Sequence, residues 1–452
     1  MPKSHRHSAA DRDTAQNQTQ AETPGLGARR GALELIERVR KGETLDNALE
    51  QSRSFAILEG ADRAFARAMA SSVLRRRGSI DHILGAYIDR PLPKKAGRVM
   101  DILRLAAVQT LVLKTPDHAA VSTAVELAGE RRETAAYAKL VNAVARKVAK
   151  NGAAALEKVP DRADTPGWMW RGWERAFGPA RARAIAQAHH VPAPLDLTVK
   201  DLNSLESHRG ALDAEVLLEK TLRLSAGGDI ADLPGYQDGR WWVQDVAASL
   251  PVRLLGDVAN KTVFDLCAAP GGKTMQLSAA GARVTAVDIS APRLERVAEN
   301  LKRTGLSATL VEADILRWSP AEKADAVLLD APCSASGTIR RHPDLPWLKT
   351  EDDVKALTAL QANMIDRALT FLKPGGVLVY CVCSLQAEEG ERQSAATLKR
   401  HGTLTRTPIA ADEIGGLQAA ITRAGELRTL PSMLNEKGGM DGFFAARFQQ
   451  SA

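Results

Sequence analysis

Val263-Phe264-Asp265-Leu266, followed directly by Cys267-Ala268-Ala269-Pro270-Gly271-Gly272-Lys273, is the stretch of sequence that decides the fold. The first four residues predict a buried strand, and the small residues after them predict a tight turn into a helix that begins near Thr274. Glycines in such a turn let the backbone approach a ligand closely, and the free N–H groups of the helix start face that ligand. The stretch therefore predicts the ligand-binding edge of an open α/β sheet.

Two familiar nucleotide-binding motifs do not fit this turn. A P-loop needs G-x-x-x-x-G-K-[ST], and although Gly272-Lys273-Thr274 matches its end, Cys267 occupies the position of the first glycine. The dinucleotide fingerprint G-x-G-x-x-G also fails, because the two glycines are adjacent.

Three further strand-like runs each end in a carboxylate. Asp288 closes the run 281–287, Asp314 follows 309–313, and Asp330 closes 326–329. The acidic residue after the second strand of a doubly wound fold accepts both hydroxyls of a ribose. Three carboxylates on one rim predict a site for an adenosine that carries a positive group.

Cysteines follow two strand-like runs, in a chain that has only four cysteines. Cys333 lies in Leu329-Asp330-Ala331-Pro332-Cys333-Ser334, and Cys383 lies in Val379-Tyr380-Cys381-Val382-Cys383-Ser384. A thiol at the end of a strand in such a sheet stands where a covalent nucleophile acts. Two such thiols predict one that attacks and one that assists release. The C-x-C pair has poor ligand spacing for zinc, so we predict no metal.

In this order the three motifs resemble the RNA 5-methylcytosine methyltransferases that use S-adenosylmethionine. Within that group the chain resembles the RsmB branch, also called Sun or Fmu, which methylates 16S ribosomal RNA. Supporting runs in the second half are 337–344 with Trp347, 243–245 with Ser249, and 441–444. In the first half, 62–65, 74–78, 118–128 and 140–144 resemble the NusB-type helical domain that this branch carries.

The resemblance implies roles for individual residues. Cys383 matches the nucleophile that adds to carbon 6 of cytosine, and Cys333 matches the cysteine that assists loss of the carbon 5 proton. Asp330 is expected to hydrogen-bond the cytosine ring, and Lys273 to orient the base or lower a thiol pKa. The cofactor site is expected to comprise Cys267, Ala268, Ala269, Pro270, Gly271, Gly272, Lys273, Asp288, Arg293, Asp314 and Asp330.

Two features near these motifs bear on the substrate. Arg340, Arg341 and His342 follow the Cys333 loop, and we expect them to contact RNA phosphates around the target nucleotide. The sequence departs from the family at Cys381-Val382, where a small residue and a threonine are usual. We interpret Cys381 as structural, and the missing threonine hydroxyl removes a hydrogen bond that it would give to the base.

The composition agrees with a nucleic-acid partner. A net charge of +7 favours a polyanion, because each phosphate that is neutralised releases counterions. No apolar run approaches the ~20 residues of a membrane span, and residues 1–7 lack the apolar core of a signal peptide. Four cysteines between 267 and 383 form no secreted disulfide framework. We therefore expect a cytoplasmic protein with no membrane partner, and the resemblance implies ribosomal RNA as its substrate. We also expect a monomer.

The chain of 452 residues is long enough for several domains. We expect a disordered tail (1–28), an all-α NusB-like RNA-binding bundle (29–151), a junction with a small α/β subdomain (160–250), and a Rossmann-like doubly wound methyltransferase domain (251–450). In the bundle, one helix face carries Ile102, Leu105, Ala106, Gln109 and Leu113, with Arg98 and Arg104 off it. Trp168, Trp170 and Trp173 in the junction fit core packing better than an RNA contact.

Two other functions stay open at this stage. The first is a 5-methylcytosine methyltransferase that acts on tRNA, because the catalytic motifs are shared and only the helical domain points to 16S rRNA. The second is a non-enzymatic RNA-binding or antitermination factor, which the helical domain alone favours. The series Asp330, Cys333 and Cys383 disfavours the second, because a scaffold needs no pair of strand-end thiols.

Overall fold

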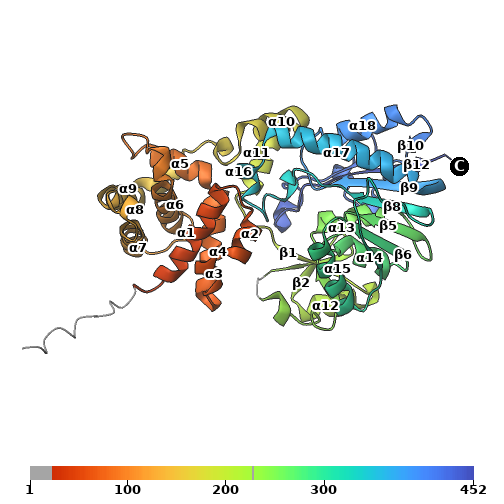
Figure 1. Ribbon diagram of the computed structural model, residues 1–452, viewed down its shortest axis with the longest axis horizontal. Helices are drawn as coiled ribbons and strands as arrows, with labels where there is room; N and C mark the ends of the chain where they lie inside the picture. Colours follow the sequence, from red (N-terminus) through yellow and green to blue (C-terminus); the bar gives the residue numbers. More distant parts are fainter. Residues whose placement is uncertain (1–22, 226–228, 452) are drawn as a thin grey trace, which may run out of the picture.

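The computed structural model describes residues 23–225 and 229–451. A helical domain lies at one end of the molecule and a large α/β domain at the other, with a helical junction between them (Figure 1). Most of the predicted tail, residues 1–22, lies outside the described residues. Its predicted end at residue 28 is too late, because the first helix, α1 (Leu26–Arg40), already includes residues 26–28.

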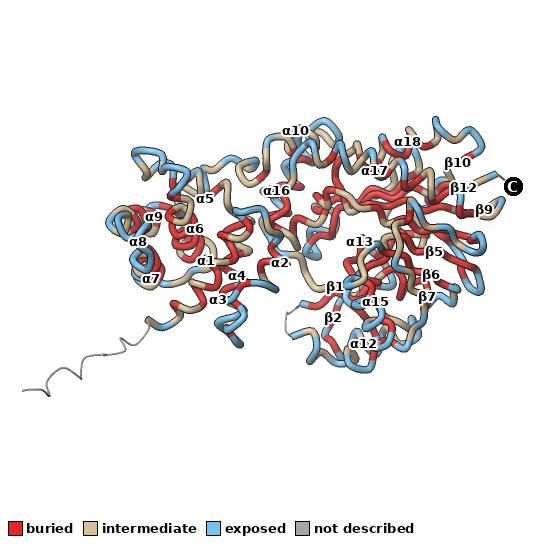
Figure 2. Tube along the Cα trace, viewed as in Figure 1, coloured by how far each residue is buried: buried red, intermediate tan, exposed pale blue. Residues whose placement is uncertain are grey.

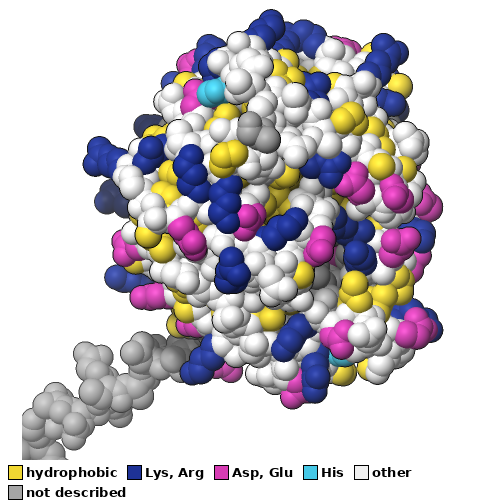
Figure 3. Space-filling model, turned by 90° about the vertical axis from the view of Figure 1, so that its right-hand side faces the viewer, with side chains coloured by type: hydrophobic (Ala, Val, Ile, Leu, Met, Phe, Trp, Pro, Cys, Tyr) yellow, Lys and Arg dark blue, Asp and Glu magenta, His cyan; other side chains and the backbone are white. Residues whose placement is uncertain are grey.

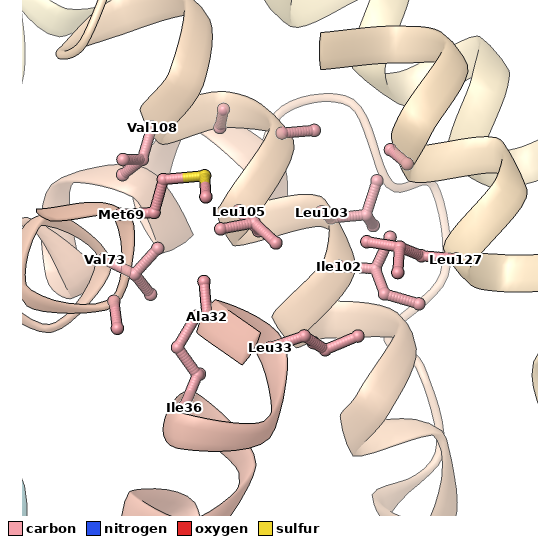
Figure 4. Close-up of a cluster of buried hydrophobic side chains, with 14 of the residues drawn as sticks. Ala32, Leu33, Ile36, Met69, Val73, Ile102, Leu103, Leu105, Val108 and Leu127 are labelled. Atoms are coloured by element: carbon pink, nitrogen blue, oxygen red, sulfur yellow. The ribbon is translucent and has the colours of Figure 1, made fainter. Parts of the chain in front are cut away.

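The N-terminal domain is entirely helical within the described residues. Its further helices are α2 (Leu45–Gln51), α3 (Arg53–Ala56), α4 (Gly60–Arg75), α5 (Arg77–Gly85), α6 (Gly97–Leu111), α7 (Asp117–Gly129), α8 (Arg132–Ala135) and α9 (Ala138–Leu156). Side chains from α1, α4, α6 and α7 meet in one core (Figure 4).

Helix α6 is the centre of this bundle, and it differs from the amphipathic helix that the sequence predicts. It is buried almost all round, because α1, α4, α7 and α9 all pack against it. Arg104, placed off the apolar face by periodicity, is only 8% exposed. Ion pairs with Asp101 and Asp81 offset the cost of burying this charge.

The junction consists of helices α10 (Gly167–Phe177) and α11 (Pro179–Ala188). Trp173 is 1% exposed, and it packs in one cluster with Ile339 and Leu385 of the large domain. The predicted core role of the tryptophan run therefore holds for Trp173, which helps to join the junction to the α/β domain.

A small antiparallel sheet follows the junction. Its strands β1 (Leu195–Val199), β2 (Ala214–Leu217), β3 (Thr221–Leu224) and β4 (Trp241–Val243) lie in the order β2-β3-β1-β4, with α12 (Leu205–Ala211) beside β2. Helix α13 (Val246–Arg253) leads from this sheet into the large domain.

The large domain contains a sheet in the order β10-β12-β9-β8-β5-β6-β7, with β11 paired to β12. Strands β7, β6, β5, β8 and β9 are parallel, and β12 and β10 are antiparallel additions at one side. The strands are β5 (Thr262–Leu266), β6 (Arg283–Asp288), β7 (Thr309–Glu312), β8 (Ala324–Asp330), β9 (Leu372–Val382), β10 (Leu404–Arg406), β11 (Leu427–Arg428) and β12 (Phe444–Gln450).

Helices cover both faces of this sheet, which confirms the predicted doubly wound fold. The helices on the sheet are α13, α14 (Gly272–Ala279), α15 (Ala291–Thr304), α17 (Glu351–Thr370) and α18 (Glu391–Arg400), whereas the short α16 (Leu345–Leu348) packs toward the junction and the helical domain. Successive residues of a strand point to opposite faces, so Val263 packs toward α13 and α14 while Phe264 packs toward α17. Every residue of β5 is buried, as are most residues of β8 (Figure 2).

The chain order of the strands locates the ligand-binding edge. From β5 the chain runs to β6 and β7 on one side, and then returns to β8 and β9 on the other side. Ligands of open α/β sheets bind at the carboxyl ends of the strands where this reversal occurs. In this protein that point lies between β5 and β8, beside residues 266–273 and 330–334.

Among residues 23–225 and 229–451, no helix is long and apolar enough to cross a membrane. On the face drawn in Figure 3, Lys and Arg side chains are interspersed with Asp and Glu side chains.

Candidate active site

The turn after β5 needs the residues that the sequence has there. Gly271 has a φ of 101° and precedes the first turn of α14. A side chain at this position would place its Cβ 3.1 Å from Val297 and would also be strained by the positive φ. The backbone N–H groups at the start of α14 are thereby held at the carboxyl edge of the sheet.

Asp288 ends β6 beside this turn, and its side chain is 2% exposed. Its carboxylate accepts hydrogen bonds from the backbone N–H groups of Ala269 (3.1 Å) and Ser290 (3.1 Å). The Arg293 guanidinium lies 3.3 Å from the same carboxylate and donates to the carbonyl oxygen of Ala269 (2.7 Å). Asp288 and Arg293 thus hold the main chain of the predicted cofactor-binding turn in place through Ala269. Asp314 lies beyond β7 with a half-buried side chain that accepts from the Leu316 N–H.

Asp330, at the end of β8, and Lys273, in the first turn of α14, form a close ion pair, with 2.7 Å between Nζ and Oδ2. Burial opposes the charge on the lysine, but Asp330 and other nearby acidic groups outweigh it and raise the pKa of Lys273. The ammonium therefore stays protonated, and it keeps Asp330 paired with a cation at the predicted reaction site.

Cys333 and Cys383 are brought together by the pairing of β8 with β9. Their sulfur atoms lie 3.5 Å apart, although the residues are 50 positions apart in the chain. The hydrogen bond with Cys383 and burial raise the pKa of the Cys333 thiol well above its usual value. Either sulfur is able to donate to the other, so an S–H on Cys333 would stabilise negative charge on the sulfur of Cys383.

The other two cysteines lie in different environments. Cys381 is fully buried, its Sγ is 3.5 Å from Oδ1 of Asp330, and burial raises the pKa of its thiol well above the usual value. Burial also raises the pKa of the Cys267 thiol. Both side chains thus remain neutral thiols, which supports the structural interpretation of Cys381.

Two acidic residues of this region were not predicted as site residues. Asp265, within β5, is fully buried and accepts from the Thr274 hydroxyl, and burial raises the pKa of its carboxyl to about 7. Among the described residues its Oδ1 has no hydrogen-bond partner. Glu389, between β9 and α18, is also fully buried and bonds to the residues that follow both central cysteines. Asp265 lies inside a predicted strand and Glu389 lies in the loop just before α18, so neither position marked it as a site residue in the sequence.

Arg340 and Arg341, which we predicted to contact RNA phosphates, have partners within the protein. Arg340 is 2% exposed, and it donates to the carbonyl oxygens of Pro192, Gly438 and Met440. Arg341 lies between Asp245 (2.6 Å) and Asp441 (2.9 Å).

His342 is more exposed, but its ring also has a protein partner. Its Nδ1 lies 3.4 Å from the Asp46 carboxylate of the helical domain. Two more contacts cross the same boundary, from the Leu45 N–H to Asp344 (3.1 Å) and from Trp347 Nε1 to the Leu74 carbonyl (2.8 Å). The segment 340–347 therefore joins the helical domain to the catalytic loop.

Replacing Arg341 with glutamine is expected to lower the free energy of unfolding by about 3–5 kcal/mol, because the buried carboxylates of Asp245 and Asp441 then lose the cation that bridges them. Urea denaturation measures this change. As a control, Arg392→Gln removes an exposed pair with Glu388 and should cost less than about 1 kcal/mol. An Arg341→Gln protein of unchanged stability but weaker RNA binding would restore the phosphate role.

Comparison with known proteins agrees with both halves of this structure. Residues 27–150 match the NusB family, and residues 252–449 match the family described as 16S rRNA methyltransferase RsmB/F. The ribosomal RNA small subunit methyltransferase B of Shewanella oneidensis is 33% identical over 434 residues, which cover 92% of this chain and 97% of that protein. Its counterpart from Klebsiella pneumoniae subsp. pneumoniae is 33% identical over 433 residues, covering 92% and 96%.

Solved structures share the fold. The protein PH0851 superposes with a TM-score of 0.72 at 21% identity, covering 95% of this chain and 99% of its own. A methyltransferase homolog from Pyrococcus horikoshii has a TM-score of 0.52 at 26% identity and covers 62% of this chain and 93% of its own. Since relatives a third identical match nearly the whole chain, the helical domain included, this chain belongs to the RsmB/F family of 16S rRNA methyltransferases.

Proposed function

We propose that this protein transfers a methyl group from S-adenosylmethionine to carbon 5 of a cytosine in 16S rRNA, through a covalent bond between Cys383 and carbon 6. The observation that carries the proposal is the 3.5 Å separation of the Cys333 and Cys383 sulfur atoms, beside the Asp330–Lys273 pair. The RsmB/F family and its 16S rRNA relatives support the substrate.

The chemistry of cytosine explains the need for a thiol. Carbon 5 is a poor nucleophile, so the Cys383 thiolate first adds to carbon 6 and forms an enamine whose carbon 5 attacks a methyl group. Asp330 hydrogen-bonds the ring nitrogen or the exocyclic amine and favours the protonated ring that accepts the thiolate. The carbon 5 proton then passes to water with the assistance of Cys333, the electron pair of that C–H bond restores the 5,6 double bond, and the Cys383 thiolate leaves carbon 6 and frees the methylated base.

The residues at the carboxyl edge fit S-adenosylmethionine, which supplies an electrophilic methyl group when bound. The positive φ at Gly271 and its closeness to Val297 require a glycine at that position. The small residues of this turn let a ligand approach the backbone N–H groups at the start of α14. The unpartnered Oδ1 of Asp265, within the part of the chain that the structure describes, is a buried acceptor below that turn. We assign cofactor binding to residues 267–273 with Asp288, Arg293, Asp314 and Asp330.

We also propose how the domains divide the work. The helical domain, from α1 to α9, recognises RNA, residues 160–250 connect it to the large domain, and residues 251–450 carry out methyl transfer. The target base has to leave any stack to reach Cys383, and unstacking costs a few kcal/mol. This cost is smallest in loosely folded RNA. An rRNA that is not yet assembled meets this condition.

Incubation with 16S rRNA and S-adenosylmethionine, followed by bisulfite sequencing, tests the proposal. We expect one cytosine of the 16S rRNA to become protected from conversion. A parallel incubation with tRNA distinguishes the other substrate class: protection in tRNA alone would overturn the rRNA assignment. Transfer of a labelled methyl group without any protected cytosine would overturn the carbon 5 chemistry.

Replacing Asp288 with alanine is expected to weaken S-adenosylmethionine binding by about 1–3 kcal/mol, because the ribose hydroxyls of the cofactor then lose the carboxylate that accepts their hydrogen bonds. Isothermal titration calorimetry measures the effect. As a control, Asp325→Ala removes a carboxylate that caps the Thr262 N–H at the opposite edge of the sheet, and binding should not change. An unchanged affinity of the Asp288→Ala protein would reduce Asp288 to a structural cap.

A further inference from the structure

Glu389 carries the most densely bonded buried carboxylate near the two central cysteines. Its Oε1 accepts from the Ser334 N–H (2.8 Å) and from Nε2 of Gln361 (3.1 Å). Its Oε2 accepts from the hydroxyl groups of Ser334 (2.5 Å) and Ser384 (2.5 Å). The side chain has no exposed surface. Four donors therefore fix both oxygens and the plane of the carboxylate.

The residues that Glu389 holds are the immediate neighbours of the two thiols. Ser334 follows Cys333 after β8, and Ser384 follows Cys383 after β9. One carboxylate thus ties together two loops that are 50 residues apart in sequence. A second set of bonds supports it, from the Leu385 N–H to the Ser336 hydroxyl (2.9 Å) and from the Gly337 N–H to the Cys383 carbonyl (3.0 Å).

The glutamate is itself held in place from the neighbouring strand and helix. The Tyr380 hydroxyl, on β9, donates to its main-chain carbonyl oxygen (2.6 Å). Gln361, on α17, also donates to the Pro332 carbonyl (2.9 Å), just before Cys333. The network therefore spans β9, α17 and both cysteine loops, so the position of the carboxylate is set independently of either loop.

We propose that Glu389 is a positioning residue, whose carboxylate sets the separation and the direction of the Cys333 and Cys383 thiols. This inference rests on the proposed function, in which the two thiols act in turn on one cytosine. Glu389 does not touch the reacting atoms, and it acts through Ser334 and Ser384.

Ordinary core packing does not account for this arrangement. A buried carboxylate is costly, and in the described residues the acceptors of Glu389 are satisfied by two hydroxyls, an amide and a backbone N–H rather than by a cation. Apolar side chains of the same volume stabilise a core at least as well as buried charge. What a carboxylate adds is geometry, because two oxygens in one plane fix the relative position of two loops.

Steady-state kinetics of four variants test the proposal. Glu389→Asp is too short to reach both serines, and Glu389→Ala lacks the carboxylate, so kcat should fall about 10- to 100-fold with KM for S-adenosylmethionine nearly unchanged. Glu389→Gln keeps the length, and both serine hydroxyls are able to accept from its amide, so kcat should stay within a few-fold of wild type. Val379→Ala, a core truncation on β9, controls for stability loss.

A second readout needs no methyl transfer. Diamide oxidises two close thiols to a disulfide and is itself reduced to a hydrazine, and peptide mapping by mass spectrometry identifies the Cys333–Cys383 bridge. The bridge should form at least about tenfold more slowly in Glu389→Asp and Glu389→Ala than in wild type, and at nearly the wild-type rate in Glu389→Gln and Val379→Ala.

The two readouts separate the outcomes. Wild-type protein that yields no 5-methylcytosine would overturn the proposed function, while slower bridging in Glu389→Asp would still support positioning. Unchanged kcat and bridging in Glu389→Asp and Glu389→Ala would overturn the positioning role. A Glu389→Gln protein as inactive as Glu389→Ala, but with wild-type bridging, would also overturn it, since the charge rather than the geometry would then matter.

Discussion

Cys383→Ala is expected to lower the rate of methyl transfer on the order of 10⁴-fold or more, because no covalent route to an activated carbon 5 remains. Affinity for S-adenosylmethionine should stay nearly unchanged, since in the proposed mechanism the thiol contacts cytosine rather than the cofactor. Methylation of 16S rRNA with a labelled methyl donor measures the first quantity, and calorimetry measures the second.

Cys381→Ala is the matched control for this prediction. Cys381 lies two residues away on the same strand, and it is fully buried against Asp330 with a thiol whose pKa is raised well above its usual value. A thiol that stays protonated is a poor nucleophile, so Cys381→Ala should retain activity. Measurable turnover by Cys383→Ala would contradict the nucleophile assignment, and turnover lost only in Cys381→Ala would transfer that role to Cys381.

The sequence was sufficient to predict the framework of the site because that framework is built from local signals. Short apolar runs that end in Asp288, Asp330 or Cys383 predict strands, and the parallel order of those strands places their carboxyl ends on one edge. The boundaries of β5 and of the turn after it were also close to those observed. The helical domain was predicted from a resemblance that the NusB match confirms.

Partners across long stretches of chain were not predictable in the same way. Arg340 and Arg341 form a basic pair directly after a catalytic loop, which is a reasonable pattern for a phosphate contact. The carboxylates that occupy Arg341 come from Asp245 and Asp441, which are 96 and 100 residues away in sequence. No local feature of the segment indicates these ion pairs. The positive charge of the segment was therefore predictable from the sequence, but its partners were not.

Glu388 and Glu389 show the same limit at two adjacent positions. Glu388 forms an ion pair with Arg392 at the surface, one helical turn later. Glu389 points inward and holds both cysteine loops. Because the two residues have the same chemistry, only the three-dimensional course of the chain after β9 decides which one becomes part of the site.

Cys333→Ala is expected to trap the reaction after methyl transfer. If Cys383 adds to carbon 6 and Cys333 is needed only for elimination, the variant still attacks and still methylates. It then stalls with the enzyme bonded to carbon 6 of the methylated base. Denaturing electrophoresis should show a protein–RNA band that requires both S-adenosylmethionine and Cys383, while multiple turnover is lost.

The 3.5 Å contact between the two sulfur atoms makes this prediction sharp, because each thiol is in reach of the same pyrimidine ring. Cys383→Ala, and the double variant with Cys333→Ala, should form no band, since the attacking sulfur is absent. Normal turnover by Cys333→Ala without an adduct would make Cys333 structural. An inactive variant without an adduct would instead mean that Cys333 is needed before the attack, where its S–H stabilises the thiolate of Cys383.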